Sequence, residues 1–148
     1  MSEDKNLIAE TKKKWETLWG SISNKPSNNP DWLERPIPPE IPYLIKKEYL
    51  PSKGNVLDIG CGTAEISLWF YKSGNYIVDA FDISENAIEI AKKMHAQTNI
   101  HFFCHNICTE ALSKKYDILV DRGCLHTIHK DLLRSYALNI SNACNPHA

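Results

Sequence analysis

The stretch Asp58–Ala64, with the sequence DIGCGTA, decides the fold because it joins a buried strand to a helix through a glycine turn. It overlaps the apolar run Asn55–Ile59 (NVLDI), which is typical of a strand buried on both faces. Glycines at positions 60 and 62 permit backbone angles that other residues avoid and let a ligand approach the main chain. We expect Ala64–Lys72 to be a helix, so the sequence predicts a ligand site at the carboxyl end of the strand.

Strands and helices alternate along the chain after this turn. The further expected strands are Tyr76–Phe81, Ile100–Cys104 and Tyr116–Asp121, and the further expected helices are Glu85–Met94, capped by Ser84, and about Lys130–Asn142. Such alternation predicts parallel strands that are joined by right-handed helical crossovers. The expected fold class is therefore α/β, with a Rossmann-like, doubly wound parallel sheet.

A less regular segment precedes this alternation. Residues 5–19 predict a helix that ends at Gly20, and residues 21–40 contain five prolines and three asparagines, which is typical of a loop. A loop of this length in a small domain is often functional. A short helix is expected from Ile41 to Leu50. We therefore divide the chain into an N-terminal segment, residues 1–40, and a ligand-binding domain, residues 41–148.

The composition is that of an ordinary globular protein. The chain has 148 residues, of which 43% are hydrophobic and 24% charged, and this is enough for one core. The net charge of -1 gives no basic field that would attract nucleic acid or an anionic membrane. The start of the chain lacks the apolar core of a signal peptide, and no apolar run is long enough for a membrane span. We therefore expect a cytoplasmic protein.

The cysteines do not predict a disulfide framework or a metal site. Their number, five, is odd, and no signal peptide is apparent. The sets Cys104/Cys108 and Cys124/His126/His129 contain metal-ligating residue types but lack the paired spacing of zinc ligands. We expect reduced, partly buried thiols and no metal.

An acidic residue follows the second expected strand and would lie near the glycine turn. Asp82 is placed there, where a carboxylate suits the two hydroxyls of a ribose. A dinucleotide site would have a third glycine at position 65, but that position is Glu65, whose charge opposes a pyrophosphate. S-adenosylmethionine carries an ammonium and a sulfonium, which the nearby Asp58 favours. The alternative is a structural turn whose two aspartates are satisfied by backbone amides.

The same segments resemble the motifs of the seven-stranded S-adenosylmethionine-dependent methyltransferases. Asp58–Gly62 resembles their first motif, DAFDIS with Asp82 their second, and YDILVDRGCLHTI their fourth-strand motif. The Asp-Arg-Gly triplet at residues 121–123 is similar to that of the thiopurine and thiol S-methyltransferase-like branch. The segment KKKWETLWGS, with Trp15 and Trp19, also resembles that branch. The segment NNPDWLERPIPPE, with Trp32, resembles it faintly.

This resemblance implies a set of site residues. The implied cofactor-binding residues are Trp15, Trp19, Asp58, Gly60, Cys61, Gly62, Asp82, Ile83, Asn106, Ile107, Asp121 and Arg122. The glycine turn would face the methionine part, Asp82 would hold the ribose, and Ile83 would pack on the adenine. The two tryptophans would close the top, which makes the N-terminal segment a helical lid. Asp121 and His126 are the candidate catalytic residues, the histidine either as a base or as a pocket-lining side chain.

The sequence departs from the family pattern in three respects. Ala64 replaces a third glycine, a mild change if the helix has already begun there, and Asn106 stands where an aspartate is usual. The family sheet has the order 3-2-1-4-5-7-6, whereas this chain supplies only the 3-2-1-4 part. We therefore expect a fragment of a longer methyltransferase, with weak or no turnover. Its fourth strand, Tyr116–Asp121, would be an open edge that favours self-association.

The expected function is methyl transfer from S-adenosylmethionine to a small molecule, such as a thiol, a thiopurine or another soft nucleophile. One alternative is a non-catalytic S-adenosylmethionine-binding module that lacks the completed sheet. A nicotinamide-dependent oxidoreductase is the weaker alternative, because Glu65 interrupts the dinucleotide pattern.

Overall fold

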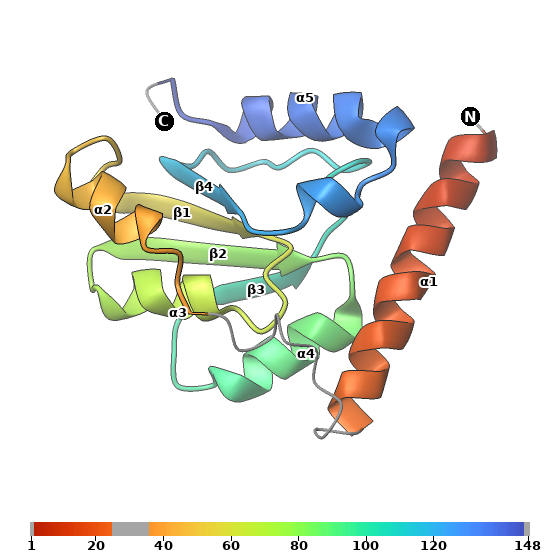
Figure 1. The fold of residues 1–148 in the computed structure, drawn as a ribbon, viewed down its shortest axis with the longest axis horizontal. Helices are drawn as coiled ribbons and strands as arrows, with labels where there is room; N and C mark the ends of the chain where they lie inside the picture. Colours follow the sequence, from red (N-terminus) through yellow and green to blue (C-terminus); the bar gives the residue numbers. More distant parts are fainter. Residues whose placement is uncertain (1, 25–35, 147–148) are drawn as a thin grey trace.

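A computed structural model describes residues 2–24 and 36–146 of the chain (Figure 1). Trp32 and most of the proline-rich loop lie outside these residues. The helices are α1 (Ser2–Asn24), α2 (Glu40–Lys46), α3 (Glu65–Lys72), α4 (Glu85–Met94) and α5 (Leu133–Ala143), with short 3-10 turns at Leu125–Thr127 and Lys130–Leu132. The strands are β1 (Gly54–Ile59), β2 (Tyr76–Asp82), β3 (His101–Cys104) and β4 (Ile118–Asp121). None of these helices is both long and apolar enough to cross a membrane.

The four strands form one parallel sheet in the order β3-β2-β1-β4, which confirms the predicted fold class. The register aligns the carboxyl ends of the central strands, because Ile59 pairs with both Phe81 and Asp121. Within the described part of the chain, β4 is the last strand on its side of the sheet. The pairing that follows there is one isolated parallel bridge between Tyr116, just before β4, and Cys144.

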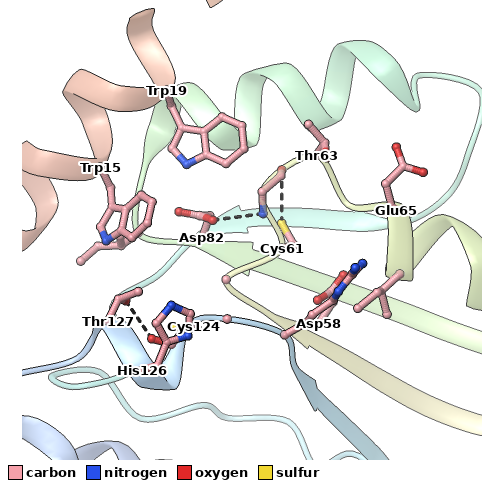
Figure 2. A pocket seen from close by; sticks show the side chains of 16 residues that line it. Trp15, Trp19, Asp58, Cys61, Thr63, Glu65, Asp82, Cys124, His126 and Thr127 are labelled. Atoms are coloured by element: carbon pink, nitrogen blue, oxygen red, sulfur yellow. Dashed lines mark hydrogen bonds between the residues drawn. The ribbon is translucent and has the colours of Figure 1, made fainter. Parts of the chain in front are cut away.

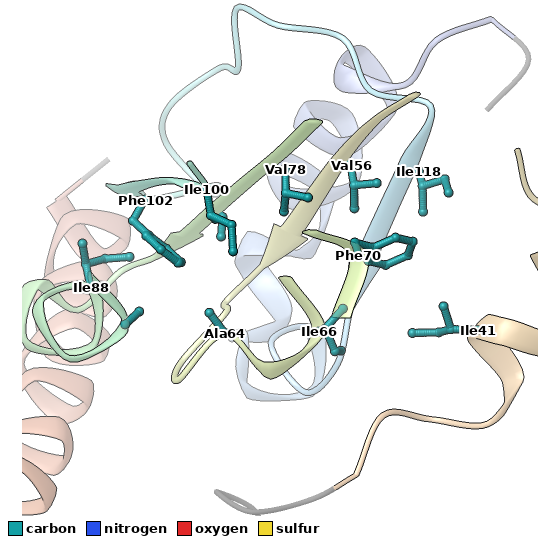
Figure 3. Packing of buried hydrophobic residues seen from close by; sticks show 12 residues of the cluster. Ile41, Val56, Ala64, Ile66, Phe70, Val78, Ile88, Ile100, Phe102 and Ile118 are labelled. Carbon is teal, nitrogen blue, oxygen red and sulfur yellow. The ribbon is translucent and has the colours of Figure 1, made fainter. Parts of the chain in front are cut away.

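Helices cover both faces of the sheet (Figure 1). On one face, Val56 and Val78 of the strands pack against Phe70 of α3 and Ile88 of α4 (Figure 3). On the other face, the next residues along the strands, such as Leu57, point toward α5. This alternation follows from the period of two in a strand, and it makes the apolar strand sequences suitable for burial on both sides.

The helix α1 stands beside the carboxyl ends of the strands and packs against α4 (Figure 1). Its buried side chains Trp19 and Ile22 contact Ala87 of α4. The helix continues through Gly20 to Asn24, so the prediction that Gly20 ends it is wrong. The additional turn buries Ile22 against α4. Glycine suits position 20 because a Cβ there would lie 3.3 Å from Nδ2 of Asn86.

Several predicted boundaries shift by a few residues. The expected helix over Lys130–Asn142 is a 3-10 turn followed by α5. Ala64 has φ 63° and ψ 35°, a left-handed conformation, so α3 begins only at Glu65. The expectation that alanine is a mild change at position 64, because the helix has already begun there, is therefore wrong. The helix begins one residue later. A left-handed conformation costs an L-residue about 1–2 kcal/mol.

Candidate functional site

A cavity of about 440 Å³ lies at the carboxyl ends of β1, β2 and β4 (Figure 2). Its walls come from the glycine turn, the start of α3, the loop after β2, the loop after β4 and one face of α1. The predicted site residues that line it are Trp15, Trp19, Asp58, Gly60, Cys61, Gly62, Asp82, Ile83, Arg122 and His126. The fold thus brings together most of the residues that the sequence singled out.

The glycine turn is packed tightly by side chains of the protein itself. Gly60 and Gly62 have φ of +65° and +51°. A Cβ at Gly60 would come within 2.8 Å of Cβ of Cys124, and a Cβ at Gly62 within 2.9 Å of the Trp19 ring. Both glycines are therefore required by backbone conformation and by their neighbours, in addition to any ligand.

The Asp82 carboxylate joins the turn to the loop after β2. Its Oδ2 accepts a hydrogen bond from the Gly62 amide at 3.1 Å, and its Oδ1 accepts one from the Ser84 amide at 3.0 Å. The side chain is buried yet lines the cavity. Burial raises the pKa of Asp82, although these amide donors act in the opposite direction. The Ile83 amide also hydrogen-bonds to this carboxylate. A carboxylate offers about four acceptor positions, so capacity for a ligand donor remains.

Asp58 adds a second buried carboxylate to the cavity wall. Its Oδ2 accepts hydrogen bonds from the amide and the hydroxyl of Ser67, at 3.1 and 2.6 Å. Burial raises the pKa of Asp58 to about 6, and the charges of Asp82 and Asp121 contribute in the same direction. The hydrogen bonds from Ser67 oppose this shift. A cation in the cavity would lower the free energy of both carboxylates.

Asp121 organises the loop after β4. Its Oδ1 accepts from the amides of Gly123, Cys124 and Leu125 at 3.1, 2.9 and 3.2 Å, and its Oδ2 accepts from the hydroxyl of Tyr136. The Asp121 side chain is not part of the cavity wall, whereas the loop that it folds contributes Arg122 and His126. The geometry indicates a positioning role, and its assignment as a catalytic residue remains a prediction.

The predicted adenine residues lie in a smaller neighbouring cavity of about 50 Å³. Asn106 and Ile107 line this second cavity, which shares Trp15 and Ile83 with the larger one. The side-chain oxygen of Asn106 accepts a hydrogen bond from the Cys108 amide at 3.0 Å. An elongated ligand could occupy both cavities, because Trp15 and Ile83 border each of them.

The thiols at the cavity are poor nucleophiles. Burial raises the pKa of both Cys61 and Cys124, and nearby carboxylates raise these pKa values further. All five cysteines are free. Among residues 2–24 and 36–146, no three histidine, cysteine, aspartate or glutamate side chains come together to form a metal site.

Sequence reasoning missed three side chains that build the site. Ser67 holds Asp58, Tyr136 holds Asp121, and Glu16 joins α1 to the loop after Asp82. Each acts from a different element than its partner, so no local pattern identifies it. The position of Glu16 between Trp15 and Trp19 was the one available signal.

Comparisons with known proteins identify the family of the chain. A family model described as "Methyltransferase domain" matches residues 56–147. The chain is 28% identical over 133 residues to 2-heptyl-1-hydroxyquinolin-4(1H)-one methyltransferase from Mycobacteroides abscessus, covering 87% of this chain and 57% of that protein. It covers a third or less of two further curated methyltransferases that it matches.

Two solved structures share the fold. One, from work on the conversion of a disulfide bond into a thioacetal group during echinomycin biosynthesis, is 32% identical, with a TM-score of 0.62 over 73% of this chain and 45% of that chain. The other, the DhpI-SAM-HEP complex, is 15% identical, with a TM-score of 0.70 over 95% of this chain and 63% of that chain. At this lower identity the second likeness concerns the fold alone.

Replacing Asp58 by asparagine should change how stability depends on pH. The folded-state pKa of about 6 lies above the ordinary value of 3.8, so the unfolded chain ionises first as the pH rises. Wild-type stability should therefore fall between about pH 4 and pH 6, by at most roughly 3 kcal/mol. Asp58→Asn removes this decline, so it should become more stable than the wild type toward pH 7. Urea unfolding at several pH values measures the difference.

Asp117→Asn is the opposite-sign control for this measurement. Hydrogen bonds from the Asn55 amide and from Asn145 lower the pKa of Asp117. Its contribution to stability is therefore present above the ordinary pKa and is lost as the pH falls through the folded-state value. Parallel pH profiles for wild type and Asp58→Asn would contradict the assignment.

A methyl group at position 62 should displace Trp19, whereas one at position 74 should not. Gly62 and Gly74 both have positive φ, but a Cβ at Gly74 meets nothing within 4 Å. Gly74→Ala should thus lower the free energy of unfolding by about 1 kcal/mol, through strain of the backbone at positive φ alone. Gly62→Ala should cost more and shift tryptophan emission to longer wavelength. Equal losses of stability with unchanged emission in both variants would show that Trp19 does not pack on the turn.

Proposed function

This chain belongs to the family of S-adenosylmethionine-dependent methyltransferases, and from this premise we propose that its cavity binds S-adenosylmethionine and serves methyl transfer to a small molecule. The observation that carries the proposal is the pair of buried carboxylates, Asp58 and Asp82, beside the glycine turn. Their charge suits a ligand with an ammonium and a sulfonium. The same charge, together with Glu65 at the start of α3, disfavours the pyrophosphate of a dinucleotide.

We propose that the cofactor spans the two adjoining cavities. In the proposed arrangement, Asp82 accepts the ribose hydroxyls while it keeps its two amide donors. The adenine extends toward Ile83 and Asn106 in the smaller cavity, which Trp15 also lines. The methionine part lies along the backbone of Gly60–Gly62, where Asp58 faces its cationic groups.

Bound S-adenosylmethionine supplies a methyl group that is already activated for in-line displacement. The chain then has to orient the two partners and exclude water, which is the proposed task of Trp15 and Trp19 on α1. His126 lies on the cavity wall. In this proposal it either takes a proton from an acceptor or only lines the pocket. The raised pKa values of Cys61 and Cys124 keep both thiols protonated, so they do not compete for the methyl group.

We assign the acceptor to the class of thiols and other soft nucleophiles. The Asp-Arg-Gly triplet at 121–123 supports this assignment through its likeness to the thiopurine and thiol S-methyltransferase-like branch. The related structure from the study of disulfide-to-thioacetal conversion also concerns sulfur chemistry. A thiol suits this site because its pKa, about 8.5 for cysteine, leaves a reactive thiolate fraction near neutral pH without a strong base.

Replacing Asp82 by alanine should weaken the binding of S-adenosylhomocysteine. Hydrogen bonds to a charged group contribute roughly 1.5–3 kcal/mol, so the affinity should fall about ten- to hundredfold. Asp79→Ala is the matched control, because Asp79 is also a buried aspartate of β2 but does not line either cavity. It should lower stability, through loss of its contacts with Lys114 and Tyr116, and leave affinity unchanged. Calorimetric titration at a temperature where both variants are folded distinguishes the two effects.

Turnover with matched acceptors tests the proposed chemistry. A panel of small thiols should yield S-adenosylhomocysteine faster than alcohols or amines of the same skeleton at pH 7 to 8. The product is quantified by mass spectrometry, with Asp82→Ala as the background control. Faster transfer to the alcohols or amines would contradict the assignment to soft nucleophiles. Binding without transfer to any acceptor would favour the alternative, a non-catalytic S-adenosylmethionine-binding fragment or module that lacks the completed sheet.

A further inference from the structure

Glu16 lies on α1 between the two tryptophans but does not line either cavity. Its carboxylate instead reaches the first turn of α4. The Oε1 atom accepts a hydrogen bond from the Glu85 amide at 2.8 Å, and Oε2 accepts from the Ser84 hydroxyl at 2.5 Å and the Asn86 amide at 3.2 Å. One side chain of α1 thus satisfies the start of another helix.

These contacts are those of a helix cap supplied by a second helix. The first amides of a helix have no partner within it, and the positive end of the helix dipole favours a carboxylate there. Ser84 already caps the Ala87 amide, so Glu16 completes the set with Glu85 and Asn86. Partial burial opposes ionisation, but the hydrogen bonds from Ser84 and from the two amides leave the pKa of Glu16 lowered.

Further contacts join α1 to α4. The Nδ2 atom of Asn86 donates to the carbonyl of Glu16 at 3.2 Å, and Gly20 provides the space for this side chain. Lys12 and Glu85 form an ion pair at 3.0 Å, but both side chains are largely exposed. The Glu16 carboxylate is therefore the main polar link between α1 and α4, and the ion pair of Lys12 is the weaker one.

The link continues from α4 into the cofactor site. Ser84, which donates to Glu16, also donates its amide to Asp82, and the other oxygen of Asp82 accepts from Gly62. The ring of Trp19, a residue of α1, packs against Gly62. A continuous chain of contacts therefore begins and ends on α1 beside the cavity, and it runs through Glu16, Ser84, Asp82, Gly62 and Trp19.

We propose that Glu16 is a positioning residue for the cofactor: through Ser84 it fixes the Asp82 carboxylate, and through α4 it holds the tryptophan-bearing helix over the cavity. This inference rests on the proposed function, because the ligand it concerns is S-adenosylmethionine. It assigns part of the cofactor affinity to a side chain that does not touch the ligand. It also makes α1 a fixed wall of the site rather than an independent appendage.

Glu16→Gln tests the proposal in the full chain. The amide retains the size of the side chain but loses its charge, and its NH2 group cannot accept from Ser84, Glu85 or Asn86. Affinity for S-adenosylhomocysteine should fall about three- to tenfold, as expected for the loss of a carboxylate at a helix N-terminus. Glu10→Gln, an exposed position on α1, and Lys12→Met, on the exposed ion pair, should change affinity less than twofold.

A double-mutant cycle separates positioning of Asp82 from simple helix packing. If Glu16 acts through Ser84 on Asp82, Glu16→Gln should have a smaller effect on affinity in the Asp82→Ala background than in the wild type. Additive effects would overturn the link to Asp82. Hydrogen exchange of the ligand-free proteins gives a second readout, in which Glu16→Gln should speed exchange at the amides of Glu85 and Asn86 and along α1.

The outcomes distinguish this inference from the function on which it rests. If wild type and Glu16→Gln bind S-adenosylhomocysteine equally well, the inference is overturned while the cofactor assignment stands. If the wild type does not bind it, the proposed function fails. Unchanged exchange at residues 85–86 in folded Glu16→Gln would overturn the inference whatever the ligand. Circular dichroism of each variant verifies that the sheet is intact.

Discussion

The register in which β1 pairs with both of its neighbours is the constraint on which the rest of the structure depends. Because Ile59 pairs with Phe81 on one side and with Asp121 on the other, three strands end at one level. The segments that leave these strands must diverge around a common space, and that space is the cavity. A shift of one residue in either pairing would turn core side chains such as Leu57 to the opposite face, so the apolar strand interiors secure the register.

The cavity is built at a cost to the protein without ligand. Asp58 and Asp82 are both buried at the cavity and are held by hydroxyl and amide donors, which leave their negative charge in place. Burial and the mutual repulsion of the carboxylates account for the raised pKa of Asp58. A cationic ligand would relieve the same repulsion, so part of the stability lost in the empty protein would reappear as binding free energy. Such an exchange between stability and affinity is common at functional sites.

The parallel fold class and the position of the site could be predicted from the sequence pattern, because alternating apolar strands and helices permit few topologies and parallel strands bring their carboxyl ends together. The strand order came from the resemblance to the methyltransferases, and the structure confirms it. Gly60, Gly62 and Asp82 could be located in this way. Glu16 could not, because its bond to Ser84 joins residues 68 positions apart and depends on where α1 docks.

Tertiary packing also overrode local preference elsewhere in the chain. Gly20 has the residue type that usually ends a helix, yet it lies inside α1 because Asn86 of α4 needs the space beside it. The role of Tyr136 is of the same kind, since only the fold of α5 against β4 brings its hydroxyl to Asp121. Such contacts leave no periodic trace in the sequence, so they become visible only in the structure.

The left-handed backbone at Ala64 has a consequence for comparing related sequences. Its methyl group is fully buried with Ile66 and Phe70 in the core cluster beneath the sheet, and Ala64 itself does not line the cavity. Gly60 and Gly62 are therefore constrained by the site, whereas Ala64 is constrained by packing in the core. In an alignment, variation at the third position would therefore track the volume available under the sheet and would carry little information about the ligand. A motif that weights all three positions equally would combine two unrelated selective pressures in one score.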